Sequence, residues 1–122
     1  MFKVIIAGSR TFNDYDLLRQ YADMKLSSVS QREEIEIVSG CARGADALGE
    51  RYAAERGYPV KRFPADWQQH GRSAGYRRNQ AMAQYADALI AFWDGQSRGT
   101  MHMIALAKEH SLMIGVKKTS NS

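Results

Sequence analysis

The stretch IEIVSGCARGADALGERYAAERG, residues 35 to 57, contains one complete strand, loop and helix. Its first five residues are rich in β-branched side chains, which is typical of a short buried strand. The glycine-bearing loop SGCARGAD, residues 39–46, overlaps the end of that strand. A helical pattern runs from Ala45 to about Arg56 and ends at Gly57, a residue type that often terminates helices. The stretch therefore predicts one βα unit.

Similar units lie on both sides of this stretch. Further strands are expected at residues 3–7, 60–63, 87–93 and 112–116, and further helices from about Asp14, over residues 74–84 and over residues 100–109. Residues 64–73, PADWQQHGRS, are expected to form a long polar loop. Alternation of short strands and helices favours a parallel sheet with helices on both faces. We therefore predict an α/β fold, a three-layer, doubly wound, Rossmann-like parallel sheet of about five strands.

Composition limits the class of protein. The 122 residues suit a single domain over residues 1–122, with a frayed tail at 117–122. The net charge of +4 suits an anionic partner, either a small phosphate or a nucleic acid. One cysteine and three scattered histidines predict neither a disulfide framework nor a metal site. The apolar runs are too short to cross a bilayer and no signal peptide is recognisable, so a cytoplasmic protein is expected.

Three loops at the expected carboxyl ends of the strands contain glycine beside small or cationic residues. They are GSR at 8–10, SGCARGAD at 39–46 and DGQSRGT at 94–100. Glycine lets the backbone approach an anion closely, and the amides of the following helix start can donate to phosphate oxygens. Each loop alone is equally well explained as a tight turn. Their coincidence favours a phosphate site, although neither GxGxxG nor GxxxxGK[ST] is present.

The helix expected from Ala74 gives independent evidence. Ala74, Arg78, Ala81, Met82 and Tyr85 share one face, so Arg78 lies on an apolar stripe. Arg77, Arg78 and Asn79 fall near the positive end of the helix dipole, where a cation is unfavourable unless an anion faces it. Arg78 is therefore predicted to contact a phosphate. The alternatives are pairing of Arg78 with Asp46 or Asp94 and simple exposure of Arg77.

Other residues at this edge have competing interpretations. Arg10 and Arg98 suit a bidentate clamp on phosphate, although Arg98 is equally well explained as a solvated loop residue. Trp93 is placed to stack on a base, but tryptophan more often packs in the core. Cys41 is better explained as a small packing residue than as a nucleophile. His70, His102 and His110 show no catalytic or metal-ligand spacing.

The order and spacing of GSR, SGCARGAD, GYRRN and DGQSRGT resemble the SLOG superfamily, in particular its short YspA-like members of bacteria and phages, over residues 2 to 116. The resemblance implies a Rossmann-like fold and a nucleotide, nucleotide-sugar or ADP-ribose type of ligand. The superfamily includes the Lonely-guy phosphoribohydrolases, whose helix-start arginine matches Arg78. Their glutamate position falls on Met103, so hydrolysis by their mechanism is not expected. SGCARGAD is also similar to a segment of the DNA-processing A proteins, which bind single-stranded DNA.

The leading hypothesis is a sensor or sequestering protein for a phosphate-bearing, nucleotide-derived molecule, such as an ADP-ribose-type or cyclic nucleotide signal. The alternatives are a nucleotide N-glycosidic hydrolase that uses Arg78, Asp46 or Asp94, and a single-stranded DNA-binding protein. No metal or cofactor is expected. A homodimer or higher homo-oligomer is expected through Met101, Ile104 and Ala105. The predicted ligand-binding residues are Gly8, Ser9, Arg10, Gly40, Cys41, Ala42, Arg43, Gly44, Asp46, Arg77, Arg78, Asn79, Trp93, Asp94, Ser97, Arg98, Gly99 and Thr100.

Overall fold

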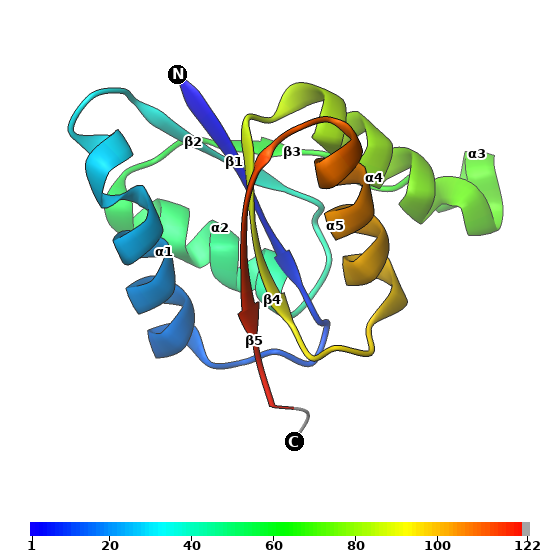
Figure 1. Ribbon diagram of the computed structural model, residues 1–122. Helices are drawn as coiled ribbons and strands as arrows, with labels where there is room; N and C mark the ends of the chain where they lie inside the picture. The colour runs from blue at the N-terminus through cyan, green and yellow to red at the C-terminus, as the bar shows by residue number, and fades with distance from the viewer. Residues whose placement is uncertain (121–122) are drawn as a thin grey trace.

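A computed structural model describes residues 1–120. Strands and helices alternate along the chain (Figure 1). The strands are β1 (Phe2–Gly8), β2 (Ile35–Ser39), β3 (Val60–Arg62), β4 (Ala88–Trp93) and β5 (Met113–Lys118). The helices are α1 (Tyr15–Ser30), α2 (Ala45–Arg56), α3 (Trp67–His70), the 3₁₀ turn η1 (Gly71–Ser73), α4 (Ala74–Tyr85) and α5 (Arg98–Glu109).

The five strands form one parallel sheet in the order β3-β2-β1-β4-β5. In the middle strand, Val4 pairs with Ile37 of β2 on one side and with Ala88 of β4 on the other. Both faces of a parallel sheet are covered by its crossover helices, so its central strands need apolar side chains on both faces. The predicted three-layer, doubly wound, Rossmann-like fold is confirmed.

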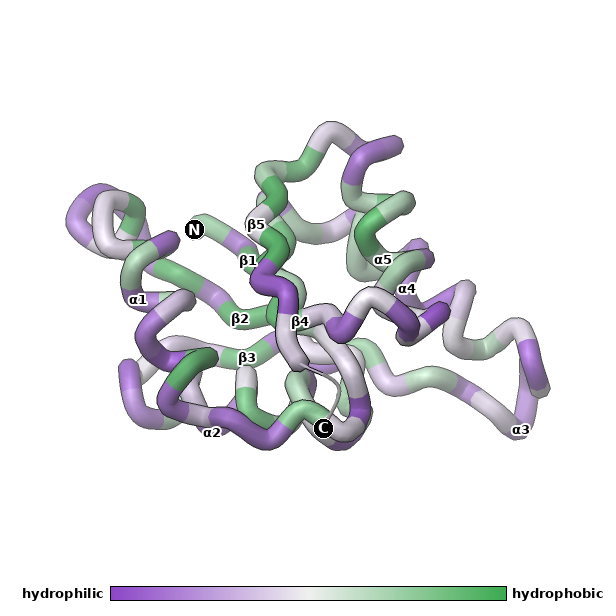
Figure 2. Tube along the Cα trace, turned by 60° about the horizontal axis from the view of Figure 1, so that its bottom comes forward, coloured by the Kyte–Doolittle hydropathy of each residue, from purple (hydrophilic) through white to green (hydrophobic). Residues whose placement is uncertain are grey.

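Alternate residues of β1 supply two separate cores. Val4 and Ile6 pack with the buried side chains of α1 and α2 on one face of the sheet. Ile5 and Ala7 pack with α4 and α5 on the other face. Figure 1 shows these two pairs of helices on opposite sides of the sheet, and Figure 2 shows α3 projecting beyond α4, away from the sheet.

This arrangement opens a crevice between the loops that follow β1 and β4. The chain leaves β1 toward α1 on one face, and it leaves β4 toward α5 on the other. The two loops therefore diverge although their strands are neighbours. In doubly wound sheets this switch point is where ligands bind.

Several sequence predictions are corrected. Residues 64–73 are not all loop, because α3 and η1 lie within them. The tail does not fray at 117, because Lys117 and Lys118 pair with Phe92 and Trp93. Residues 121–122 of that tail lie outside the described residues.

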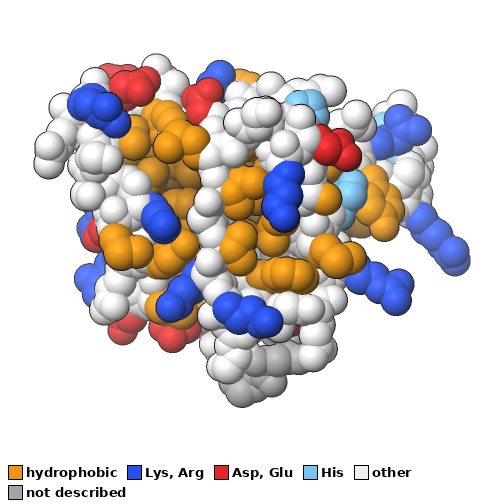
Figure 3. Space-filling model, viewed as in Figure 1, with side chains coloured by type: hydrophobic (Ala, Val, Ile, Leu, Met, Phe, Trp, Pro, Cys, Tyr) orange, Lys and Arg blue, Asp and Glu red, His pale blue; other side chains and the backbone are white. Residues whose placement is uncertain are grey.

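The predicted oligomerisation patch is corrected at one residue, Ile104. Ile104 is buried against the sheet, whereas Met101 and Ala105 are exposed. Figure 3 shows that apolar side chains are interspersed with Lys and Arg on the face formed by α1, β5 and α5. None of the helices within residues 1–120 combines the length and apolarity needed to cross a membrane.

Candidate functional site

A cleft of about 390 Å³ lies at the switch point, beyond the ends of β1 and β4. We call it the loop cleft. Its floor includes Met82 and Met103, and its walls come from the loops after β1, β2 and β4 and from α4. The lining residues are Ala7, Gly8, Ser9, Arg10, Thr11, Ala42, Asp46, Arg78, Asn79, Met82, Asp94, Ser97, Gly99, Thr100 and Met103.

The first and second loops are held against each other by backbone contacts. The Ser9 carbonyl accepts from the amide of Ala45 at 3.2 Å and from that of Phe12 at 3.2 Å. Gly44 precedes α2 with a φ of 76°, and a Cβ there would collide with the carbonyl groups of Ser9 and Arg10. Only glycine therefore allows this approach. The Ser9 hydroxyl is buried at the cleft and has no hydrogen-bond partner of good geometry among the described residues.

Asp46 is a buried carboxylic acid in the wall of the loop cleft. It lies in the first turn of α2, is only 7% exposed, and accepts from the Ala42 amide at 3.2 Å. Burial raises the pKa of Asp46 to about 6, although the Ala42 amide and the Arg78 guanidinium partly oppose this shift. The carboxyl therefore exchanges its proton near neutral pH, unlike an ordinary aspartate.

Arg78 is fixed from two sides. Its Nη1 donates to the Gly40 carbonyl, and its Nε donates to Asn79 Oδ1 at 2.9 Å. Asn79 Nδ2 lies 3.4 Å from the Gly99 carbonyl and 3.2 Å from His102 Nδ1. This series of contacts connects the second loop, α4 and the start of α5. Burial lowers the pKa of His102, which favours the neutral ring that can accept from Asn79.

The fourth loop presents the amino end of α5 to the cleft. The Asp94 carboxylate accepts from the amides of Gln96 and Ser97, each at 2.8 Å, and these bonds lower its pKa. Ser97 caps the helix, since its hydroxyl accepts from Thr100 N at 3.4 Å and contacts Thr100 Oγ1 at 3.0 Å. The amides of Arg98 and Gly99 donate to no acceptor among the described residues. They can therefore donate to an anion.

A second cleft of about 420 Å³ adjoins the loop cleft. We call it the arginine cleft. It shares Arg10, Ala42 and Arg78 with the loop cleft. Its other lining residues are Gly40, Cys41, Arg43, Pro64, Ala65 and Trp67.

The structure brings together most of the predicted site residues. Of these, Gly8, Ser9, Arg10, Ala42, Asp46, Arg78, Asn79, Asp94, Ser97, Gly99 and Thr100 line the loop cleft, and Gly40, Cys41 and Arg43 line the arginine cleft. Gly44 lies behind the walls, at the contact between the first two loops. Arg77, Trp93 and Arg98 line neither cleft. The Trp93 indole donates to the Ser97 carbonyl at 3.1 Å and packs against the core.

Some lining residues escaped the sequence analysis. Met82 is recognisable only as a core residue, because its helical spacing predicts burial without showing that it meets a cleft. Met103 is connected with the site only through the resemblance to the phosphoribohydrolases. Trp67 lines the arginine cleft because α3 contacts α4, and no local sequence pattern reveals this contact. Cys41 adopts a left-handed φ of 66°, and burial raises the pKa of its thiol, which argues against a reactive thiolate.

No metal centre is evident in the part of the chain that the structure describes, since no group of three or more His, Cys, Asp or Glu side chains is placed to hold an ion. The chemistry of the two clefts instead consists of guanidinium groups, hydroxyls, backbone amides and one carboxyl with a raised pKa. These groups suit recognition of phosphates and sugar hydroxyls.

Comparisons with known proteins give a family and a fold. The model of a family described as "YspA, cpYpsA-related SLOG family" matches residues 2–70. The Gene 61 protein of Mycobacterium phage D29 is 34% identical over 122 aligned positions, and the match covers 93% of this chain and 94% of that protein.

Two solved structures of DNA processing protein A share the fold. The Streptococcus pneumoniae protein has a TM-score of 0.70 at 18% identity, over 98% of this chain and 51% of that one. The Helicobacter pylori protein, described for its single-stranded DNA binding mode, has a TM-score of 0.71 at 18% identity, over 99% of this chain and 67% of that one. This chain thus spans about half the length of the pneumococcal protein.

Proposed function

Because this chain belongs to the YspA, cpYpsA-related SLOG family, we propose that it binds a phosphate-bearing, nucleotide-derived small molecule in the loop cleft. The observation that carries the proposal is the fixed Arg78 guanidinium in the wall of the loop cleft, together with the nearby buried Ser9 hydroxyl, which has no hydrogen-bond partner of good geometry among the described residues. A buried polar group without a partner is costly, and an oxygen-rich ligand would relieve that cost.

The cleft offers separate groups for phosphate and sugar. The amides of Arg98 and Gly99, together with the Arg78 guanidinium, suit phosphate oxygens. Asp46 and Asp94 are acceptors that suit ribose hydroxyls. The volume of about 390 Å³ lies within the range of roughly 300–1,000 Å³ that is usual for small-molecule sites.

The floor of the cleft favours binding without cleavage. Met103 lines the loop cleft and is 1% exposed, at the position where the resemblance to the phosphoribohydrolases would require a glutamate. A thioether can neither transfer a proton nor stabilise a developing oxocarbenium ion as a carboxylate does. Sensing or sequestration of the ligand is therefore the function that the site supports best.

The test is direct measurement of binding. Isothermal titration of the protein with ADP-ribose, a cyclic nucleotide and ribose 5-phosphate should show saturable binding of at least one of them. Arg78→Ala should weaken that binding about 10- to 100-fold, because charge-assisted hydrogen bonds contribute about 1.5–3 kcal/mol each. Arg77→Ala is the matched control, since the neighbouring exposed arginine lines neither cleft.

Urea unfolding of both variants should accompany the titration, because Arg78 also donates to the Gly40 carbonyl. Mass spectrometry of the recovered nucleotide separates binding from hydrolysis. Intact ligand supports sensing or sequestration, and a cleaved product would replace that proposal with an enzyme. Saturable binding of none of the probes would contradict the proposal.

Single-stranded DNA binding is the second candidate. The Helicobacter pylori protein of similar fold is described as binding single-stranded DNA, and Arg10, Arg43 and Arg78 surround the arginine cleft of this chain. A salt series with an oligonucleotide tests this candidate. The logarithm of the binding constant should fall with the logarithm of salt concentration, with a slope of about −0.7 per phosphate contacted. A shallow slope for a small nucleotide favours the first proposal.

A further inference from the structure

Trp67 is exposed without a packing role that explains it. Trp67 is the first residue of α3, a four-residue helix with no buried residue, and it is 53% exposed. Asp66 caps this helix by accepting from the Gln69 amide at 3.1 Å. This local bond fixes the backbone that carries the tryptophan. Large exposed aromatic surfaces commonly mark binding sites, because their burial by a partner is strongly favourable.

The indole and the Arg78 guanidinium border the same gap. A Cβ built on Gly75 would lie 3.5 Å from Cη2 of Trp67 and 3.9 Å from Nη2 of Arg78. Glycine at position 75 therefore leaves open the space between an aromatic ring and a cation. The other exposed aromatic on this side, Tyr76, packs edge-on against His102 with ring centroids 4.4 Å apart, and it does not line the cleft.

Charge distinguishes the two clefts. The arginine cleft is lined by Arg10, Arg43 and Arg78 and by no carboxylate, whereas Asp46 and Asp94 line the loop cleft. None of the three arginines forms an ion pair with any of the described residues. The arginine cleft is therefore the more electropositive of the two and is open to a further anionic group.

The two clefts adjoin at Arg10, Ala42 and Arg78, which line both of them. We infer that the arginine cleft is a second subsite, in which an aromatic base stacks on Trp67 beside the three arginines. The ligand then carries a base and two linked phosphates, with a terminal sugar in the loop cleft. Its chemical class is a nucleoside diphosphate joined to a second sugar. This inference rests on the proposed function, because it extends the ligand out of the loop cleft.

The test compares two probes that differ in what they place in the arginine cleft. Ribose 5-phosphate reaches only the loop cleft, whereas ADP-ribose spans both clefts. The wild type should bind ADP-ribose more tightly and lose tryptophan fluorescence on binding. Trp67→Ala should weaken ADP-ribose binding about tenfold, because base stacking on an aromatic side chain contributes about 1–3 kcal/mol, and should leave ribose 5-phosphate binding unchanged.

Three further variants sharpen the result. Trp67→Phe should retain most of the ADP-ribose affinity but lose the fluorescence change. Tyr76→Ala is the matched control, since Tyr76 is 57% exposed and lies outside the cleft. Gly75→Leu should lower ADP-ribose affinity by filling the gap while Trp67 and all three arginines remain, whereas Gly75→Ala, whose Cβ makes only ordinary contacts, should not.

The outcomes separate the two proposals. If neither probe binds to the wild type, the proposed function fails. If both probes bind equally well, or Trp67→Ala weakens both to the same extent, the second subsite is wrong while the proposed function stands. If Trp67→Ala instead weakens only a strongly salt-dependent oligonucleotide complex, the subsite belongs to nucleic acid and the inferred ligand class is overturned.

Discussion

Asp46 shows how one residue couples ligand recognition to folding. Its carboxyl group is buried beside the Gly40 backbone, where a Cβ on that glycine would lie 2.8 Å from Oδ2 of Asp46 and 2.9 Å from Nη1 of Arg78. The second loop thus passes between a buried carboxyl group and a partly buried guanidinium cation. Because burial raises the pKa of Asp46 to about 6, ionisation of this side chain opposes folding.

The resulting pH dependence is a first prediction. The folded state holds the proton up to about pH 6, whereas the unfolded chain releases it near its ordinary pKa of 3.8. The free energy of unfolding should therefore fall as the pH rises from about 4 to about 6 and then level off. Relative to Asp46→Asn, the wild type should lose on the order of 2–3 kcal/mol across that window, measured by urea unfolding at several pH values.

Asp94→Asn is the control for this prediction. Amide hydrogen bonds lower the pKa of Asp94, so its contribution to stability is present above its ordinary pKa and is lost as the pH falls. The difference between wild type and Asp94→Asn should therefore change with pH in the opposite direction. A constant difference between wild type and Asp46→Asn would contradict the prediction.

At the residue scale, the sequence predicts which residues belong to the site better than it predicts what each of them contacts. Arg78 could be placed at the site because a cation on an apolar stripe near a helix start requires an explanation. Its actual acceptors, the Gly40 carbonyl and the Asn79 side chain, depend on tertiary distances. Trp93 and Trp67 illustrate the same limit, because only the fold shows which of the two tryptophans lines a cleft.

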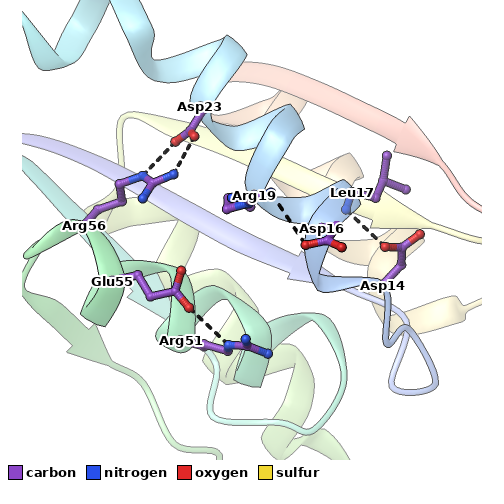
Figure 4. A network of polar contacts seen from close by, with 8 residues as sticks. All are labelled: Asp14, Asp16, Leu17, Arg19, Asp23, Arg51, Glu55 and Arg56. Atoms are coloured by element: carbon purple, nitrogen blue, oxygen red, sulfur yellow. Dashed lines mark hydrogen bonds and ion pairs between the residues drawn. The ribbon is translucent and has the colours of Figure 1, made fainter.

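At the scale of elements, α1 and α2 are joined by a network around Asp23. Asp23 Oδ1 accepts from the Tyr52 hydroxyl at 2.6 Å, and its two oxygens accept from Arg56 at 3.0 and 2.6 Å (Figure 4 shows the arginine contacts). Tyr52 is fully buried, so its hydroxyl depends on this one carboxylate. The network therefore fixes how the two helices lie on their face of the sheet.

A second prediction follows for this network. Asp23→Ala should lower the free energy of unfolding by about 1–3 kcal/mol, because it leaves a buried hydroxyl without a partner. In a Tyr52→Phe background the same change should cost less than about 1 kcal/mol, since the remaining contact with Arg56 is partly solvated. A double-mutant cycle by urea unfolding measures the difference.

The exposed pair between Asp16 and Arg19, drawn in the same view, provides the comparison. Its nitrogen and oxygen are 3.6 Å apart and Asp16 is 81% exposed, so Asp16→Ala should cost less than about 1 kcal/mol. Equal costs for Asp23→Ala with and without the Tyr52 hydroxyl would show that the buried bond contributes little.

The elements themselves were largely predictable, and the exceptions have physical causes. Long apolar or periodic segments such as β4 and α2 follow directly from the pattern of their residues. The helix α3 is too short for periodicity, and the only signal for it was Asp66 three residues before Gln69, a helix-capping pattern. Ile104 was assigned to the surface, although its spacing with Thr100, Met103 and Ala107 indicates the buried face of α5.

Across the whole molecule, the free energy of local opening should decrease from the centre of the sheet toward α3. The central strands β1 and β4 are buried and pair on both sides, whereas α3 and η1 bury no residue. Segments with few buried contacts open with little free energy, while the last amides to exchange report global unfolding. The molecule therefore combines a rigid sheet with a weakly held segment beside its arginine cleft.

Hydrogen exchange gives the third prediction. The amide hydrogens of residues 64–73 should exchange faster than those of the other helices and strands. The amide hydrogens of residues 4–7 and 88–92 should exchange slowest. Mass spectrometry of the exchanged protein measures both. Addition of ADP-ribose should slow exchange in residues 64–73 if the base stacks on Trp67. Similar protection of α3 and β1 in the free protein would contradict the expected gradient.

The parallel arrangement of the first and last strands has a practical consequence for every binding measurement described above. Because β1 and β5 run in the same direction, Met1 lies at the amino ends of the strands and Ser120 at their carboxyl ends (Figure 1). Ser120 and Thr119 border a small hollow that also contains Ser9 and Asp94 of the loop cleft. A purification tag or sensor-surface tether fused behind the last strand would therefore crowd the entrance to the ligand site. The same tether placed ahead of Met1 would leave that entrance accessible to solvent.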